Sequence, residues 1–142
     1  MKHAKIYAAI GIAILGLCFS SGSTAGEEKE AHALTAAKTW LALVDEGIYG
    51  DSWTTAAAYF KNAITKEKWE QMLTAVRNPL GRLVSRELIS TTYTQSLPAA
   101  PDGEYVVIQF KTNFENKKSA IETVTPMLEN VGEWRVSGYY IK

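Results

Sequence analysis

Cysteine and histidine are nearly absent from the sequence. Cys18 is the only cysteine, and the only histidines are His3 and His32. A disulfide needs a pair of cysteines, and structural zinc sites are built mainly from cysteine and histidine. The composition therefore excludes a disulfide framework and a zinc centre, and we expect neither a metal site nor a cofactor.

Motifs for nucleotide binding and nucleophilic catalysis are also missing. The chain has no glycine-rich phosphate loop, no serine on a nucleophile elbow and no histidine within the part expected to fold. Basic and acidic residues are balanced, with 15 of each and no basic patch. Hydrolase and nucleotide-binding functions thus lack their usual parts, and the charge argues against a nucleic-acid partner.

The N-terminus has the pattern of a secretory signal peptide. Two lysines precede an apolar run from Ile6 to Phe19, and small residues follow as far as Ala25. Ser23 and Ala25 suit the −3 and −1 positions of a cut after Ala25. The run is shorter than the about 20 residues that a spanning helix needs. We predict that residues 1–25 are cleaved and that the mature protein is periplasmic or secreted, without a stable membrane anchor.

Cleavage would also remove chemistry from the chain. Cys18 lies inside the apolar run, and the bulky Leu17 before it does not suit lipid attachment. Loss of Lys2 and Lys5 changes the net charge from zero to −2. The mature protein would then have no cysteine and a mild acidic excess.

The pattern after the signal is at first helical. Apolar residues recur at three- and four-residue steps in three successive segments, which predicts three helices. The first ends near Gly47, the second begins near Trp53, and the third is capped by Thr65 and stops at Asn78, before Pro79.

The period then changes to two, which indicates strands. We expect four of them, over residues 84–94, 104–115, 119–128 and 133–141. In the second strand one face carries Val106, Ile108, Phe110, Thr112 and Phe114. Helices followed by antiparallel strands predict an α+β fold, with three N-terminal helices packed on a curved four-stranded antiparallel sheet. Residues 26–32 are expected to form a loose leader before a single domain over residues 33–142.

Many residues of the mature chain match the pattern of one known family. They are Trp40, Asp45, Tyr49, Ser52, Trp53, Trp69, Arg77, Pro79, Gly81, Arg86, Leu97, Pro98, Gly103 to Tyr105, Phe110 to Phe114, Glu122, Gly132 to Val136 and Gly138 to Tyr140. The chain resembles the domain-of-unknown-function 4019 family, a set of small exported bacterial proteins. The resemblance implies a cone-shaped fold similar to the nuclear-transport-factor-two and ketosteroid-isomerase-like group, and it implies no activity.

Ligands of such cones lie between helices and sheet, so polar residues expected there are candidate site residues. The candidates for ligand binding are Tyr49, Arg86, Glu122 and Tyr139. Arg86 alternates in phase with apolar neighbours, and an inward arginine needs a partner. We predict that Arg86 pairs with Glu122; alternatively, Arg86 grips the carboxylate of a ligand.

Asp45 and Glu122 are the low-specificity candidates for a catalytic base. For Asp45 we favour a structural role, in which it accepts a hydrogen bond from a nearby tryptophan or backbone N–H and ties two helices together. Arg77 is expected on a helix surface or at a helix C-terminus. The four tryptophans, Trp40, Trp53, Trp69 and Trp134, are expected in the core rather than on a sugar-binding platform.

The sequence favours an exported cell-envelope protein that is a non-enzymatic binding or interaction module. Its partner would be another envelope protein, a second copy paired through the face that bears Val107, Gln109 and Lys111, or a small apolar ligand in the cone. The alternative is a small acid–base enzyme of isomerase or hydratase type. An open pocket lined by the candidate residues would favour ligand binding or catalysis, and a core filled by tryptophans would favour the interaction module.

Overall fold

The computed structural model describes residues 25–142, so the predicted signal peptide lies outside the described residues except for Ala25. Four helices come first: α2 (Ala25–Asp45), α3 (Tyr49–Thr54), α4 (Ala58–Ala63) and α5 (Lys66–Leu80). Four strands follow: β1 (Leu83–Thr94), β2 (Tyr105–Phe114), β3 (Lys117–Leu128) and β4 (Trp134–Ile141). The strands lie where the sequence predicts them, and the α+β class is confirmed.

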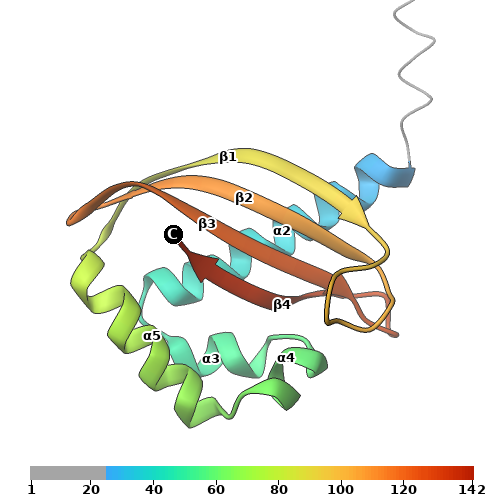
Figure 1. Ribbon diagram of the computed structural model, residues 1–142, viewed down its shortest axis with the longest axis horizontal. Coiled ribbons are helices and arrows are strands. Elements are labelled where there is room, and N and C mark those ends of the chain that lie inside the picture. The colour runs from blue at the N-terminus through green and yellow to red at the C-terminus, as the bar shows by residue number, and fades with distance from the viewer. Residues whose placement is uncertain (1–24) are drawn as a thin grey trace, which may run out of the picture.

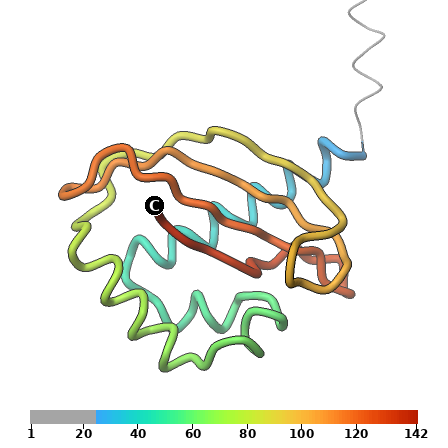
Figure 2. Tube along the Cα trace, viewed as in Figure 1, coloured from blue at the N-terminus to red at the C-terminus, as the bar shows by residue number. Residues whose placement is uncertain are grey.

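The strands form one antiparallel sheet in the order β1-β2-β3-β4, so each strand pairs with its neighbour in sequence. The sheet arches over the helices, which all lie on one side of it (Figure 1). The longest helix, α2, contacts all four strands, and α3 packs mainly on α5. Figure 2 traces this path from the helices into the meander of strands. None of the helices between residues 25 and 142 is long and apolar enough to cross a bilayer.

The prediction of a loose leader at residues 26–32 is wrong, because this segment forms the first turns of α2. Polar contacts hold it against the sheet. Lys29 Nζ lies 2.6 Å from Glu104 Oε1, and Glu30 accepts hydrogen bonds from the Thr91 hydroxyl at 3.0 Å and the Tyr93 amide at 3.2 Å. These partners are more than 60 residues away in sequence, so the local pattern carries no sign of them.

The predicted second helix is two short helices, so the described residues contain four helices rather than three. The break falls at Ala56 and Ala57, both fully buried. There the Ala57 amide donates to the Val136 carbonyl of β4 at 2.8 Å instead of continuing the helix. A backbone bond to the edge of the sheet thus interrupts a helical pattern.

The last helix begins as predicted and ends two residues later. Thr65 caps α5 by accepting from the Lys68 amide at 3.2 Å. Pro79 lies in its final turn, so the helical hydrogen bond that proline cannot make is lost only at the end of the helix. Gly81 then ends the helix with φ of +78°, and a Cβ there would approach Glu115 to 2.9 Å.

The core lies between α2 and the inner face of the sheet. The predicted inward face of β2 is confirmed, since its five residues are all buried: Val106, Ile108, Phe110, Thr112 and Phe114. Trp40 and Trp69 are buried as predicted, and Phe60 packs edge-on against Trp69 at 4.7 Å between ring centroids. Trp53 and Trp134 are only half-buried and pack against the rim of the core.

Candidate functional site

Asp45, Arg86, Glu122 and Tyr139, which the sequence singled out, meet in one buried cluster beneath the sheet. Arg86 lies at its centre, on the inner face of β1. Its Nε donates to Glu122 Oε1 at 2.7 Å, and its Nη1 and Nη2 donate to the two oxygens of Asp45 at 2.7 and 2.9 Å. The predicted Arg86–Glu122 ion pair is therefore confirmed. One guanidinium joins the end of α2 to β1 and β3.

Glu122 is fully buried and has a hydrogen-bond donor on each side. Thr112 donates to Oε1 at 2.6 Å, and the Tyr139 hydroxyl donates to Oε2. Burial raises the pKa of Tyr139, and the neighbouring Glu122 carboxylate raises it further. Burial alone would lower the pKa of Arg86, but its hydrogen bonds to Asp45 and Glu122 outweigh that effect and raise it. The cluster thus holds Tyr139 neutral and Arg86 charged.

Arg77 belongs to the same cluster, which corrects its expected place on a helix surface. Only 5% of Arg77 is exposed, and its Nη2 donates to Asp45 Oδ1 at 3.0 Å. Its guanidinium lies 4.8 Å from the centre of the Phe114 ring. The signal was present in the sequence, because Arg77 continues the stripe of Trp69 and Leu73 at steps of four. Its Nε and Nη1 have no hydrogen-bond partner among the described residues.

The phase argument for Arg86 gave the right direction for a partly wrong reason. Its supposed apolar companions are exposed, Val84 to 66% and Leu88 to 44%. Register shifts lie between Leu83 and Ser85 and between Leu88 and Ser90, so β1 does not alternate regularly. The ion pair was predicted correctly because a buried arginine requires a partner of opposite charge. The periodicity of β1 did not support that prediction.

The arrangement of charges makes this cluster a structural tie. Two carboxylates, Asp45 and Glu122, face two guanidinium groups, so the formal charges cancel. Every carboxylate oxygen already accepts at least one hydrogen bond. A general base must reach its substrate, and Glu122 has no exposed surface. Neither carboxylate lines either of the two hollows described below.

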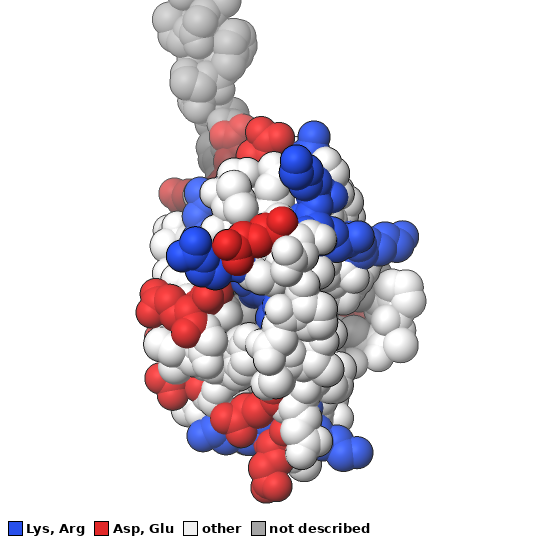
Figure 3. Space-filling model, turned by 90° about the vertical axis from the view of Figure 1, so that its left-hand side faces the viewer, with Lys and Arg blue, Asp and Glu red and all other residues white. Residues whose placement is uncertain are grey.

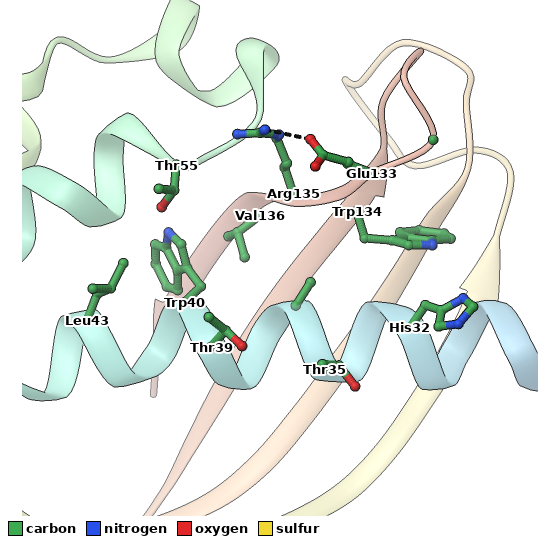
Figure 4. A pocket seen from close by; sticks show the side chains of 12 residues that line it. His32, Thr35, Thr39, Trp40, Leu43, Thr55, Glu133, Trp134, Arg135 and Val136 are labelled. Carbon is green, nitrogen blue, oxygen red and sulfur yellow. Dashed lines mark hydrogen bonds and ion pairs between the residues drawn. The ribbon is translucent and has the colours of Figure 1, made fainter.

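A groove of about 620 Å³ opens on the other flank of α2, between this helix and the start of β4 (Figure 4). None of the predicted site residues lines it. Its lining consists of one stripe of α2, the loop after α3 and the turn into β4: His32, Thr35, Ala36, Thr39, Trp40, Leu43, Thr55, Gly132, Glu133, Trp134, Arg135 and Val136. Figure 4 places His32 and Trp134 at one end, and Trp40, Leu43 and Thr55 at the other.

One of the four indole N–H groups, that of Trp134 at the groove, is left unbonded by the rest of the described chain. The indole N–H groups of Trp40, Trp53 and Trp69 donate to Ser52 O, Ile64 O and Ser52 Oγ. The indole of Trp134 has no such acceptor within residues 25–142. Glu133 and Arg135 on the opposite rim pair with each other at 2.6 Å. Arg135 Nε also lies 3.4 Å from Glu129 Oε1, so both charged residues of the lining are already engaged in ion pairs.

Trp40 separates the groove from the charge cluster. One side of its ring lines the groove, and its edge packs against Tyr139 at 5.2 Å between ring centroids. Tyr139 in turn donates to Glu122. The buried ion pairs thus support the floor of the groove without reaching into it.

Tyr49 belongs to neither place. It is half-buried against the core, where its carbonyl accepts from the Ser52 hydroxyl at 2.7 Å.

A second, shallower hollow of about 430 Å³ lies along α5, lined by Glu67, Glu70, Gln71, Thr74 and Ala75.

The face shown in Figure 3 carries both acidic and basic side chains, with a largely uncharged region in the middle. Within residues 25–142, no three histidine, cysteine, aspartate or glutamate side chains are grouped to hold a metal ion.

Comparison with known proteins places the chain in a family without giving it an activity. No curated protein and no solved structure matches it. Residues 36–139, which run from the second half of α2 into β4, match the family model described as Protein of unknown function (DUF4019). The resemblance noted in the sequence is thereby confirmed, and the chain belongs to the DUF4019 family.

Proposed function

We propose that this protein is a non-enzymatic binding module of the bacterial cell envelope, and that its ligand lies in the groove between α2 and β4. The observation that carries the proposal is the groove itself. It combines an apolar floor around Trp40 and Val136 with unpaired polar groups at its rim, of which the Trp134 indole is one. Ligand sites in proteins combine apolar walls with a few polar groups in this way.

The interior is a poorer place for a ligand than the groove. Trp40, Trp69 and Phe60 fill the space between the helices and the sheet. The arch of the sheet supports the cone-shaped fold that the family resemblance implies, and side chains fill the space beneath the arch. The isomerase or hydratase alternative is less well supported, because Asp45 and Glu122 are both engaged by arginines.

Export to the envelope is the other half of the proposal. It rests on the signal-peptide pattern of residues 1–25. Protein expressed in a bacterium with its own N-terminus and recovered from the envelope should have the intact mass of a chain that begins at Gly26. An intact mass that includes residues 1–25 would contradict cleavage.

Native mass spectrometry of the mature protein, purified from the envelope of its source, tests ligand binding. We expect a bound mass on the unmodified protein and its loss in Ala36→Trp, which fills the groove from α2. The matched control is Ala75→Trp, in the shallow hollow on α5. A protein that carries no bound mass, or an adduct equally abundant on Ala36→Trp and Ala75→Trp, would rule out the groove as the binding site.

A further inference from the structure

We infer that the α2–β4 groove binds a neutral saccharide, whose ring stacks on Trp134; this rests on the proposed binding function and specifies its ligand. The first reason is charge. The α2 side of the groove carries no carboxylate, lysine or arginine. On the other side Glu133 is paired at 2.6 Å with Arg135, which also lies 3.4 Å from Glu129. A charged ligand would find no free counter-charge in this lining and would have to break that pair.

The second reason is the mixture of surfaces. The faces of a sugar ring consist of C–H groups, whereas its edge carries hydroxyls that both donate and accept hydrogen bonds. The half-buried Trp134 offers a flat apolar surface together with an unused N–H donor. Across the groove, Thr35 and Thr39 stand one helical turn apart on α2. The Thr35 hydroxyl donates to the Ala31 carbonyl at 3.1 Å and can still accept a hydrogen bond, whereas the Thr39 hydroxyl has no partner within residues 25–142. Ring face and ring edge thus each find a matching partner.

The third reason is what the fold excludes. An extended peptide would bind by adding a strand to the free edge of β4. That edge is already covered at Val136, whose carbonyl accepts from the Ala57 amide at 2.8 Å. The Ala58 amide is likewise bonded to Glu129 Oε2 at 2.7 Å, which holds the start of α4 against the turn between β3 and β4. A strand-adding peptide would have to displace this segment.

A long acyl chain fits no better. It would need an enclosed apolar channel, whereas this groove is open and its rim consists of threonines, a histidine and an ion pair. Lipid contact would leave the Thr39 hydroxyl and the Trp134 N–H, which have no partner among the described residues, without hydrogen bonds. A hydroxylated ring satisfies them, so the saccharide is the occupant that the lining fits.

The test is a titration of the mature protein, residues 26–142, followed by NMR of its four tryptophan indole N–H groups. The probes are chitotriose and maltotriose as neutral saccharides, with lauric acid and a neutral tetrapeptide for comparison. We expect at least one of the two saccharides, at millimolar concentration, to shift the Trp134 resonance. The indoles of Trp53 and Trp69, which are bonded internally, should shift little.

Two variants separate stacking from hydrogen bonding. Trp134→Ala should weaken saccharide binding roughly tenfold or more. Because Trp134 also packs against the core, Thr39→Val is the second variant, and it removes one exposed hydroxyl at constant volume. We expect it to weaken binding several-fold, whereas the matched Thr74→Val on α5 should leave it unchanged.

The outcomes distinguish the ligand class from the binding function. One outcome is that neither saccharide shifts the Trp134 resonance, although the unmodified protein still carries a bound mass that Ala36→Trp loses. The groove would then bind a ligand of another chemical class, and the saccharide proposal would be wrong. A Trp134 shift with lauric acid or the tetrapeptide alone would lead to the same conclusion. If there is neither a shift nor a bound mass, the proposed function fails as well.

Discussion

Arg86 and Glu122 form an ion pair across a strand to which neither belongs. Arg86 lies on β1 and Glu122 on β3, yet their Nε and Oε1 atoms are 2.7 Å apart on the helix-facing side of β2. Thr112 of β2, the strand partner of Arg86, donates to the same Glu122 oxygen at 2.6 Å. The pair therefore fastens three strands together on the face where α2 packs.

Removal of Glu122 should be among the most damaging single changes in the protein. Glu122→Ala leaves the Arg86 guanidinium largely buried without one of its two carboxylates, so we expect a loss of about 3–5 kcal/mol in the free energy of unfolding. Urea denaturation followed by circular dichroism measures it. Glu87→Ala, at an exposed position on the same strand as Arg86, is the control and should stay within about 0.5 kcal/mol. Equal effects of the two variants would show that the ion pair adds nothing.

The two arginines of the cluster should differ in importance. Arg86→Met deprives both carboxylates of their main partner. Arg77→Met leaves Asp45 with both hydrogen bonds from Arg86, and it removes two buried N–H groups that have no partner among the described residues. We expect Arg77→Met to cost less than half as much as Arg86→Met in urea unfolding, with the latter near about 3–5 kcal/mol. A larger cost for Arg77→Met would contradict this ranking.

The sequence predicted those features that depend on local periodicity or on the cost of an unpaired charge. The alternation of β2 placed Phe110 and Phe114 in the core, and the inward direction of Arg86 called for Glu122. Features that depend on distant backbone were missed. The backbone hydrogen bond from Ala57 to Val136, which splits the predicted second helix, joins residues far apart in the sequence. No sequence pattern near Ala57 indicates it.

The groove was missed for a related reason. Its α2 lining includes His32, Thr35 and Thr39, which look like an ordinary polar helix face in the sequence. They become a site only because the turn into β4 places Trp134 opposite them (Figure 4). The sequence did single out Trp134, but its strand pattern predicted a core role for a side chain that is half-buried in the structure.

Tyr139 should make the protein less stable at high pH. Its pKa is raised by burial and by Glu122 in the folded state, whereas an unfolded tyrosine titrates near about 10. Above that pH the unfolded state loses the proton and the folded state keeps it, so stability falls as pH rises. Above pH 10, the unfolding free energy of the wild type should fall relative to that of Tyr139→Phe by up to about 1.4 kcal/mol per pH unit. Parallel pH profiles would rule this out.

The start of α2 should loosen in acid. Hydrogen bonds from Lys29 and then Tyr93 lower the pKa of Glu104, so its contribution is present above the ordinary glutamate range and is lost as the pH falls through the lowered value. Protonated Glu104 no longer pairs with Lys29, and the polar turns over residues 26–32 have few apolar contacts to replace that bond. Hydrogen exchange, corrected for intrinsic rates, should therefore rise at residues 29–32 in acid while Trp40 and Val44 stay protected. Lys29→Met should give the same local increase at neutral pH. If residues 29–32 and the rest of α2 lose protection together, the helix opens as one unit and the contact between Lys29 and Glu104 is not what holds its start.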